Sequence, residues 1–419
     1  MLNVLIPVAA IYSNTALFMT SGVLPPPLGG SGFLGQHVVF ELQKEAQKMH
    51  KGKGTPQNSE GEVTAKTAEE TNRLRCIKEI RVLDVKPYNP CLVPPAGAST
   101  KVVFQKCDVR DLTQLTKAVE GAAAIINCSA VTPNLLREDL GCDDHMYQVN
   151  VDGIKNVVSA CCRSGVRALI HTSTLSVKVA GTKLLGHTET LTPHIAENNL
   201  TLGNYARMRL RAEEIVLGAH DMCTDTGDIL QTIVLRPPLL YGEGDPSFVP
   251  YILRLASASG NRLPSVGNPA AFLQAAYAGN LGVAHVYALK HLLNGPAGGV
   301  QGCGGLPMYV TDDTPPNNLP GLAEPFLHHL HLQPSRNTSY WVLYLLLILS
   351  SLWAFVWSLL GYNSEGIPSS LPLLPLHRSA STIIVVSRMR AELHTGYTPA
   401  YTWEEARQRS NSYYTKNLM

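Results

Sequence analysis

Short apolar runs alternate with longer amphipathic stretches along the chain from about residue 36 to residue 245. The runs have strand length and are rich in Val, Ile and Leu, whereas the stretches between them have helical length and spacing. The sequence predicts strands at 80–84, 102–104, 122–127 and 168–171, and helices at 36–50, up to 119, at 150–162 and past 205. Such alternation predicts an α/β fold built on a doubly wound parallel sheet.

A glycine-rich loop precedes the first predicted helix. Gly29, Gly32 and Gly35 are spaced three residues apart, and the helix is expected from Gln36 to His50. Glycine lets the backbone turn sharply and approach a pyrophosphate, while the free N–H groups at a helix N-terminus attract the phosphates. The loop is a candidate dinucleotide cradle, although a glycine triplet alone is common in turns that bind nothing.

The segment before this loop is unusual for a dinucleotide-binding fold. A buried parallel strand should run directly into the glycines, but Pro25, Pro26 and Pro27 lack the N–H groups that a central strand donates. Residues 3–8 could form a displaced first strand followed by a looped insertion. Residues 1–28 carry no basic residue, so they make a poor signal peptide. The sequence favours the other interpretation, in which residues 1–28 are an atypical and non-native leader from a mis-assembled reading frame.

Asp84 ends the next predicted strand. An acid at this point of a dinucleotide fold accepts hydrogen bonds from the adenosine ribose and repels a 2′-phosphate, which favours NAD over NADP. The usual offset from the glycine loop is about 20 residues, and Asp84 lies further along. The polar run at 51–75, which has no apolar period, is interpreted as a surface insertion that accounts for the excess.

Composition excludes several classes of function. The 419 residues are 45% hydrophobic and 16% charged, which suits a large globular core, and the net charge of +2 without a long basic run argues against nucleic acid as a partner. Nine cysteines include no C-x-x-C pair, so neither a metal site nor a disulfide framework is predicted. Reduced thiols facing the cytosol are the expected state.

Residues 340–360 form an uncharged segment with tryptophan and tyrosine at its rims. At 1.5 Å per residue it is long enough for a hydrocarbon layer of about 30 Å, so a membrane helix is predicted. The following tail at 361–419 is expected to pack on the catalytic body. An embedded or hairpin helix that returns with the aid of Leu371–Leu376 is therefore favoured over a single span.

An ordered series of motifs resembles the extended short-chain dehydrogenase superfamily, and more narrowly the 3-beta-hydroxysteroid dehydrogenase / delta-5-delta-4 isomerase family. The motifs are GGSGFLG at 29, LDV at 83, CDVRD at 107, NVDGIKNV at 150, HTSTLSV at 171, YARMR at 205, LRPPLLYGEGD at 235, YAGNLGVAHVYAL at 277, YVTDDTP at 309 and GYTPAYTWEEA at 396. The resemblance implies an NAD(P)-binding Rossmann domain at 29–245 and a substrate-binding region at 246–335. It extends from about Gly29 to the end of the chain.

The same resemblance implies a catalytic group of Thr174, Tyr205 and a lysine four residues later, where this chain has Arg209. Thr174 would orient the substrate oxygen and Tyr205 would remove its proton. The pKa of a free tyrosine is about 10, and lowering it by three units requires roughly 4 kcal/mol of preference for the phenolate. Arg209 keeps the charge and the helical position, but its planar fork is bulkier and does not transfer protons. A surface ion pair between Arg209 and Glu213 is the alternative.

Twelve residues are implied as cofactor contacts. They are Gly29, Gly32, Phe33, Leu34, Gly35, Asp84, Asp108, Val109, Asn150, Tyr205, Arg209 and Pro237. Two of them keep alternatives open. Asp108 either caps a helix or touches adenine, and Asn150 either holds backbone near the site or acts as a helix N-cap. His171 is expected to be a core histidine.

The resemblance implies NAD-dependent oxidation of a 3-beta-hydroxysteroid to the 3-oxo steroid, and it leaves open whether double-bond isomerisation follows. Expected partners are a steroid or sterol and membrane lipid, with homo-oligomerisation left open. The expected location is a membrane of the endoplasmic reticulum, or alternatively of mitochondria, with the catalytic domain facing the cytosol. The rivals are another extended short-chain reductase or sugar-nucleotide epimerase, and a non-catalytic dinucleotide-binding membrane protein.

Overall fold

The computed structural model describes most of the chain. The described residues are 16–19, 27–28, 30–51, 77–97, 100–132, 143–180, 183–258, 261–263, 268–294, 304–327, 333–334 and 381–418, with single positions at 345, 348, 349 and 352. Gly29, residues 3–8, all but the first residue of the 51–75 run and most of the 340–360 segment lie outside them. The interpretations of those segments therefore stay predictions.

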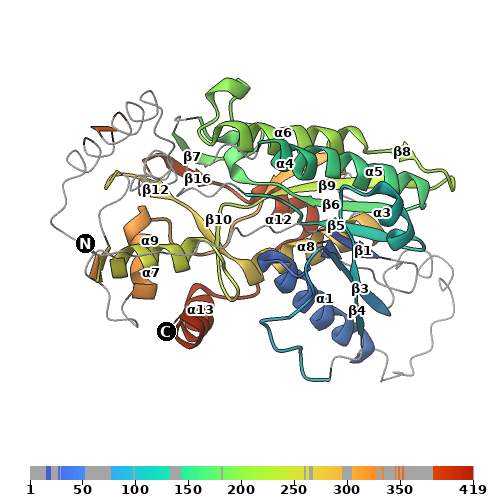
Figure 1. Cartoon of the computed structure of the whole chain (residues 1–419), viewed down its shortest axis with the longest axis horizontal. Coiled ribbons are helices and arrows are strands. Elements are labelled where there is room, and N and C mark those ends of the chain that lie inside the picture. Colours follow the sequence, from blue (N-terminus) through green and yellow to red (C-terminus); the bar gives the residue numbers. More distant parts are fainter. Residues whose placement is uncertain are drawn as a thin grey trace, which may run out of the picture.

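A mostly parallel sheet forms the centre of the protein (Figure 1). Its strands lie in the order β14-β9-β6-β5-β2-β1-β3-β4, with β8 beside β9. The bounds are β1 Ala16–Met19, β2 Pro27–Leu28, β3 Glu79–Asp84, β4 Lys101–Lys106, β5 Ala124–Asn127, β6 Ala168–Thr172, β8 Met222–Cys223, β9 Ile229–Arg236 and β14 Leu306–Tyr309. The predicted α/β architecture is confirmed, because neighbouring strands from β5 to β14 all pair in parallel.

Helices cover both faces of this sheet. One face carries α1 (Phe33–Lys51) and α8 (Ala278–Asn294), and the other carries α3 (Leu112–Val119), α5 (Gly153–Arg163) and α6 (Gly203–Gly218). Neighbouring residues of one strand face opposite layers, so Ile126 joins the apolar cluster under α1 whereas Ile125 joins the cluster under α5. Burial on both faces explains why these strands are continuous apolar runs.

The first-strand position is filled in an unexpected way. Between β3 and β5 lies β1, which runs antiparallel to both, with Leu17 opposite Ile126 and Ala16 opposite Leu83. The two-residue β2 adds a single parallel pairing between Leu28 and Asn127. The expectation of a wholly parallel sheet is therefore wrong at this position. A central gap would leave the N–H and C=O groups of β3 and β5 unpaired, and β1 supplies partners that the proline run cannot.

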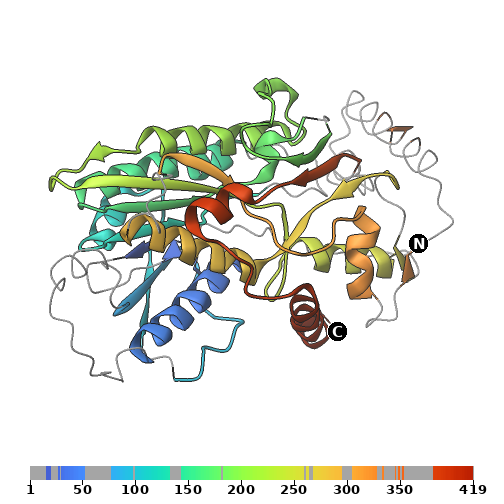
Figure 2. The ribbon, with the colours of Figure 1, turned by 180° about the vertical axis from the view of Figure 1, so that it is seen from behind.

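Most of the remaining described elements form a smaller region towards one end of the molecule (Figure 2). They are η3 Leu175–Lys178, β7 Leu184–His187, β10 Leu239–Tyr241, α7 Phe248–Ala258, β11 Arg262–Leu263, β12 Phe272–Leu273, β13 Ala275–Tyr277, α9 Leu319–Leu327, β15 Gln333–Pro334, β16 Ile383–Val386 and α13 Trp403–Leu418. Helix α12 (Met389–Thr395) contacts α8 and β14, and the short turns α4 (Asp143–Tyr147) and η4 (Glu197–Asn199) contact α6. The strands form the small sheets β10–β13, β11–β15 and β12–β16–β7.

The last helix is tied to the loop that follows β10. Arg409 of α13 donates a hydrogen bond to the Glu243 carboxylate at 2.9 Å, and the Tyr414 hydroxyl bonds the backbone of Gly242. Residues 381–418 thus contact the catalytic body. Among the described residues, no helix is both long and apolar enough to cross a membrane.

Candidate active site

The glycine loop leads directly into α1. The Gly32 carbonyl accepts the N–H of Gln36 at 3.1 Å, and the Gln36 side chain returns a hydrogen bond to the Ser31 carbonyl at 3.0 Å. Phe33, Leu34 and Gly35 form the first turn of the helix. The chain therefore presents a helix N-terminus beside a tight turn, which is the arrangement that binds phosphate groups.

Asp84 lies at the end of β3 and contacts the same loop. Its side chain is 2% exposed, and its carboxylate accepts the N–H of Lys86 at 3.0 Å and a backbone hydrogen bond from Ser31. Burial raises the pKa of Asp84 from 3.8 to about 6, against the lowering effect of these N–H groups. The structure thus brings together the two features from which the sequence predicted a dinucleotide site.

Asp108 follows β4 and forms an ion pair with Arg110 at 2.6 Å. Burial alone would raise the pKa of Asp108, but the hydrogen bonds from Arg110 outweigh it and hold the pKa below its usual value. The cap of α3 is Asp111, whose carboxylate accepts the N–H of Gln114. The alternative that Asp108 caps this helix is therefore wrong.

Asn150 holds the backbone that follows β5. It lies in the π-helical turn η2 (Gln148–Asp152), and its buried amide forms two hydrogen bonds of 2.8 Å, with the N–H and the C=O of Val131. The N-cap alternative is not observed, whereas π-turns are frequent at functional sites. Val109 is buried beside the same segment, where a Cβ on Gly153 would meet its Cγ2 at 2.7 Å. Only glycine allows this close approach.

Thr174 lies just beyond the end of β6 and caps η3. Its Oγ1 accepts the N–H of Ser176 at 3.2 Å and shares a 2.7 Å hydrogen bond with the Ser176 hydroxyl. The next residue, Leu175, donates its N–H to the Pro237 carbonyl at 2.8 Å. These contacts fix the Thr174 segment against the end of β9. Ser176 was missed in the sequence, although it is a second hydroxyl two residues after the first.

Arg209 is buried at the carboxyl ends of two central strands. The side chain is 2% exposed, and its guanidinium donates to the Ser129 carbonyl at 3.2 Å and to the Thr172 carbonyl. Glu213 instead pairs with Arg236 at 2.6 Å, and both of these side chains are buried. The predicted alternative of a surface pair between Arg209 and Glu213 is therefore wrong.

Tyr205 lies one helical turn before Arg209 on α6, and this helix packs against η3, which Thr174 caps. The tyrosine is half-buried against the cluster under α5. Burial raises the pKa of Tyr205 and the Arg209 charge lowers it, with a net pKa above the ordinary value. The Arg209 charge thus lowers the pKa of Tyr205, which is the direction expected of a cation at this position.

Two histidines lie beneath this site. His171 is fully buried and its Nδ1 lies 3.0 Å from the Asn127 amide, so it is the core histidine that was expected. Burial and the nearby Arg209 lower the pKa of His171, which keeps the ring neutral. His285, which the sequence did not single out, shares a 2.7 Å hydrogen bond with the Thr172 hydroxyl.

Three buried polar atoms at this edge have no hydrogen-bond partner among the described residues. They are Nε of Arg209, Oγ of Ser173 and Nε2 of His171. Buried polar groups are usually satisfied, so unpaired ones at the ends of parallel strands fit a polar ligand such as a ribose or an alcohol. Together with the α1 N-terminus and Asp84, they form a donor and acceptor set suited to a dinucleotide.

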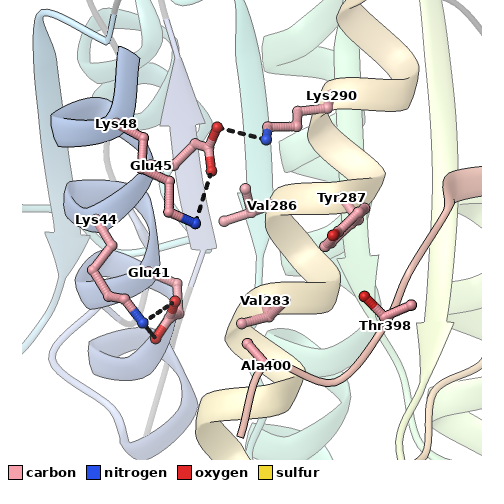
Figure 3. A pocket seen from close by; sticks show the side chains of 10 residues that line it. All are labelled: Glu41, Lys44, Glu45, Lys48, Val283, Val286, Tyr287, Lys290, Thr398 and Ala400. Atoms are coloured by element: carbon pink, nitrogen blue, oxygen red, sulfur yellow. Dashed lines mark hydrogen bonds and ion pairs between the residues drawn. The ribbon is translucent and has the colours of Figure 1, made fainter. Parts of the chain in front are cut away.

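A cavity of about 140 Å³ lies elsewhere, between α1 and α8 (Figure 3). Charged residues line it, but they pair with each other, as Glu45 does with Lys290 at 2.5 Å and Glu41 with Lys44 at 3.1 Å. It lies on the α1 and α8 face of the sheet, whereas Tyr205 lies on the α6 face. The cavity is therefore separate from the candidate active site.

A profile of the 3-beta hydroxysteroid dehydrogenase/isomerase family matches residues 68–342. The chain belongs to this family. It is therefore an oxidoreductase of the extended short-chain type. Two mouse proteins are similar over 91% of the chain. One is sterol-4-alpha-carboxylate 3-dehydrogenase, decarboxylating (25% identical, 88% of its length covered), and the other is 3 beta-hydroxysteroid dehydrogenase type 7 (26% identical, 93% covered).

Solved structures share the fold at lower identity. An epimerase from Methanothermobacter thermautotrophicus is 13% identical with a TM-score of 0.62, over 96% of this chain and 94% of its own. A dTDP-glucose 4,6-dehydratase from Streptomyces venezuelae, solved as a double mutant with NAD bound, is 17% identical with a TM-score of 0.61, over 94% and 97%. These likenesses confirm the fold of the chain.

Proposed function

We propose that this protein oxidises a 3-beta-hydroxysteroid or sterol to its 3-oxo form with NAD as the hydride acceptor. Thr174 holds the C3 oxygen, Tyr205 removes the hydroxyl proton, and Arg209 favours the phenolate by its charge. The α1 N-terminus with Gly32 and Gly35, together with Asp84, holds the dinucleotide. The names of the two mouse relatives support this substrate class, since one is a sterol-4-alpha-carboxylate 3-dehydrogenase and the other a 3 beta-hydroxysteroid dehydrogenase.

The chemistry sets what each side chain must do. NAD, when bound, accepts the hydride from C3. The alcohol O–H bond breaks at the same time, so a base must lie within hydrogen-bond reach of that oxygen. Tyr205 is such a base only if its phenolate is stabilised, and Arg209 lowers its pKa in this sense. The Thr174 and Ser176 hydroxyls form a pair in which one oxygen can bond the substrate while the other orients it.

One observation carries the proposal. The buried Arg209 guanidinium joins the end of β5 to the end of β6 and lies one turn beyond Tyr205 on the helix that packs against η3. Glu213, the surface partner considered for Arg209, pairs with Arg236 instead. The burial of Arg209 at the carboxyl ends of the strands is the position that a site cation requires.

The test compares Tyr205→Phe, Arg209→Lys and the unaltered chain for NADH formation from a 3-beta-hydroxysteroid, a 4-carboxylated 3-beta-hydroxysterol and a sugar nucleotide. Tyr205→Phe should lower the rate by at least a factor of 10² because it removes the base. Tyr413→Phe, a tyrosine of α13, is the matched control and should leave the rate unchanged. If neither the unaltered chain nor Arg209→Lys forms NADH with any sterol while both bind NADH, the non-catalytic alternative replaces this proposal.

We also propose that the protein is associated with the membrane of the endoplasmic reticulum, with the catalytic domain in the cytosol. The uncharged 340–360 segment supports attachment, and a sterol that partitions into lipid can then enter the site without crossing water. All six described cysteines are free thiols, which suits a reducing compartment. Cell fractionation with protease treatment of intact microsomes tests this; a catalytic domain protected from protease would contradict it.

A further inference from the structure

The small sheet β12–β16–β7 has one apolar face that the described residues leave uncovered. Its strands pair in parallel, with Phe272 opposite Ile383 and Leu185 opposite Val385. These four side chains share one face of the sheet, because residues in register point to the same side. Phe272 is 49% exposed and Leu185 is 68% exposed, while Ile383 and Val385 are half-buried.

The opposite face of this sheet packs against the candidate active site. Leu184, which is fully buried, joins Ile384 and Val386 in an apolar cluster with Leu175. Leu175 is the residue next to Thr174. The sheet is therefore a single layer between the proposed catalytic hydroxyl and the exterior.

An apolar outer face is unusual for such a sheet. Parallel sheets occur almost only with both faces covered, and contiguous exposed apolar patches mark sites of protein or membrane contact. The sheet is also free of charge, since β7 (LLGH), β12 (FL) and β16 (IIVV) contain no Asp, Glu, Lys or Arg. The one charged residue directly before β7 is Lys183, an exposed cation of the kind that anionic headgroups attract.

The position of the uncharged 340–360 segment in the chain indicates that lipid covers this apolar face. β15 ends at Pro334, six residues before that segment, so at 3.3–3.6 Å per residue the segment begins within about 20 Å of β15. β16, which runs through the middle of the small sheet, is the first described strand after it. If residues 340–360 enter the bilayer, as the proposed function holds, β15 and β16 are the described strands that flank the membrane segment in the sequence.

We infer that the outer face of the β12–β16–β7 sheet rests on the lipid bilayer, with Phe272 and Leu185 inserted at its surface. This inference rests on the proposed membrane attachment and adds the orientation of the catalytic domain. A sterol leaving the bilayer at this sheet would be released one protein layer away from the Thr174 segment.

The test places an environment-sensitive fluorescent amino acid at position 185, 272 or 222 of the full chain in nanodiscs. Met222 of β8 is the matched control, because it is 44% exposed and lies at the opposite end of the molecule (Figure 1). Brominated lipid should remove roughly half of the emission at 185 and 272, since interfacial apolar groups insert about 5–10 Å, and it should leave 222 unchanged. Hydrogen exchange of the unaltered chain should show slower exchange in β7 with lipid, and none of this slowing in β8.

Each other outcome overturns the inference. Equal quenching at 185 and 222 would mean that the face has no defined contact with lipid. Blue-shifted emission without quenching would mean that residues 340–360 or a second copy of the chain cover the face instead. NADH formation from a 3-beta-hydroxysteroid, measured in the same nanodiscs, separates the two proposals: an active enzyme with an unquenched face refutes only the docking, and an inactive one with a quenched face refutes only the catalysis.

Discussion

Replacing Asp84 by asparagine should stabilise the protein at neutral pH while weakening its hold on the dinucleotide. Asp84 is 2% exposed, and its carboxylate accepts hydrogen bonds from the backbone N–H groups of Lys86 and Ser31. Among the described residues, no positively charged side chain forms a hydrogen bond with this carboxylate. Burial is the largest effect and raises the pKa of Asp84 from 3.8 to about 6. The folded protein therefore holds this carboxylate in a charged form that its surroundings disfavour.

The size and sign of the effect follow from this shift. The folded protein binds the proton more tightly than the unfolded chain does, so the cost of ionised Asp84 is absent below pH 4 and complete above pH 6. A rise of about two units corresponds to about 3 kcal/mol at 1.36 kcal/mol per unit. The amide of asparagine, like the protonated acid, carries no charge, and the shift already includes the favourable N–H groups. Asp84→Asn should therefore gain about 3 kcal/mol above pH 7 and nothing at pH 4.

Urea unfolding followed by far-UV circular dichroism at pH 4 and pH 8 measures the change in the free energy of unfolding. Asp108→Asn is the matched control, because Arg110 holds the pKa of Asp108 below its usual value, and that substitution should destabilise the protein at pH 8. An unchanged or lower stability of Asp84→Asn at pH 8 would refute the reasoning, as would an equal gain at both pH values.

The functional cost of the same substitution is read from NADH titrations. A carboxylate accepts hydrogen bonds from both ribose hydroxyls, whereas an amide presents one acceptor and one donor group. Asp84→Asn should therefore weaken NADH binding by about tenfold, which corresponds to 1.4 kcal/mol, and reduce the preference over NADPH. A gain in stability together with a loss of NADH affinity is expected where a charged group serves binding but destabilises the folded protein.

Two further substitutions test the polar contacts around the site. Glu213→Gln should cost about 3–5 kcal/mol in unfolding free energy, because it leaves the buried Arg236 charge unpaired, and Arg236→Met in the same chain should restore much of it. Asn150→Leu should cost about 2–4 kcal/mol by leaving the N–H and C=O of Val131 unsatisfied, whereas Asn150→Asp should cost more at pH 8, because it buries a carboxylate against the Val131 carbonyl. Chemical denaturation checks both, and equal losses for the two Asn150 variants would contradict the second.

The sheet was predictable because its strands are buried on both faces. The expected strand at 80–84 is β3 at Glu79–Asp84, and the one at 168–171 is β6 at Ala168–Thr172. The pairing of β7 with β16 was not predictable, since Leu184 and Ile384 are 200 residues apart and each strand has only four residues. Short strands carry little pattern, and their partners are decided by tertiary packing.

The candidate site was also predictable only in part. Motif spacing placed Tyr205 and Arg209 on one helix, but only the fold shows that the guanidinium reaches the carbonyls of Ser129 and Thr172. An arginine side chain spans several rotatable bonds, so its sequence position leaves both the surface pair and the buried position open. The alternatives for Asp108 and Asn150 were likewise decided by the fold. Asp111, not Asp108, caps α3, and Asn150 bonds the backbone of Val131, which is distant in the sequence.

The position of the dinucleotide cradle depends on helix packing rather than on the first strand. In a regular dinucleotide-binding sheet the glycine loop directly follows a parallel strand, but here the two-residue β2 before the loop makes one parallel pairing. Helix α1 is instead fixed by α8, where a Cβ on Gly282 would meet the His37 carbonyl at 2.9 Å, so the two helices approach as closely as glycine allows. His37 also bonds the Glu243 carbonyl at 2.9 Å, and Glu243 accepts hydrogen bonds from Tyr277 and Arg409. Helix α13 thus helps to fix the position of α1, whose N-terminus would bind the phosphates. These contacts explain how the dinucleotide cradle keeps its position although the first strand is altered.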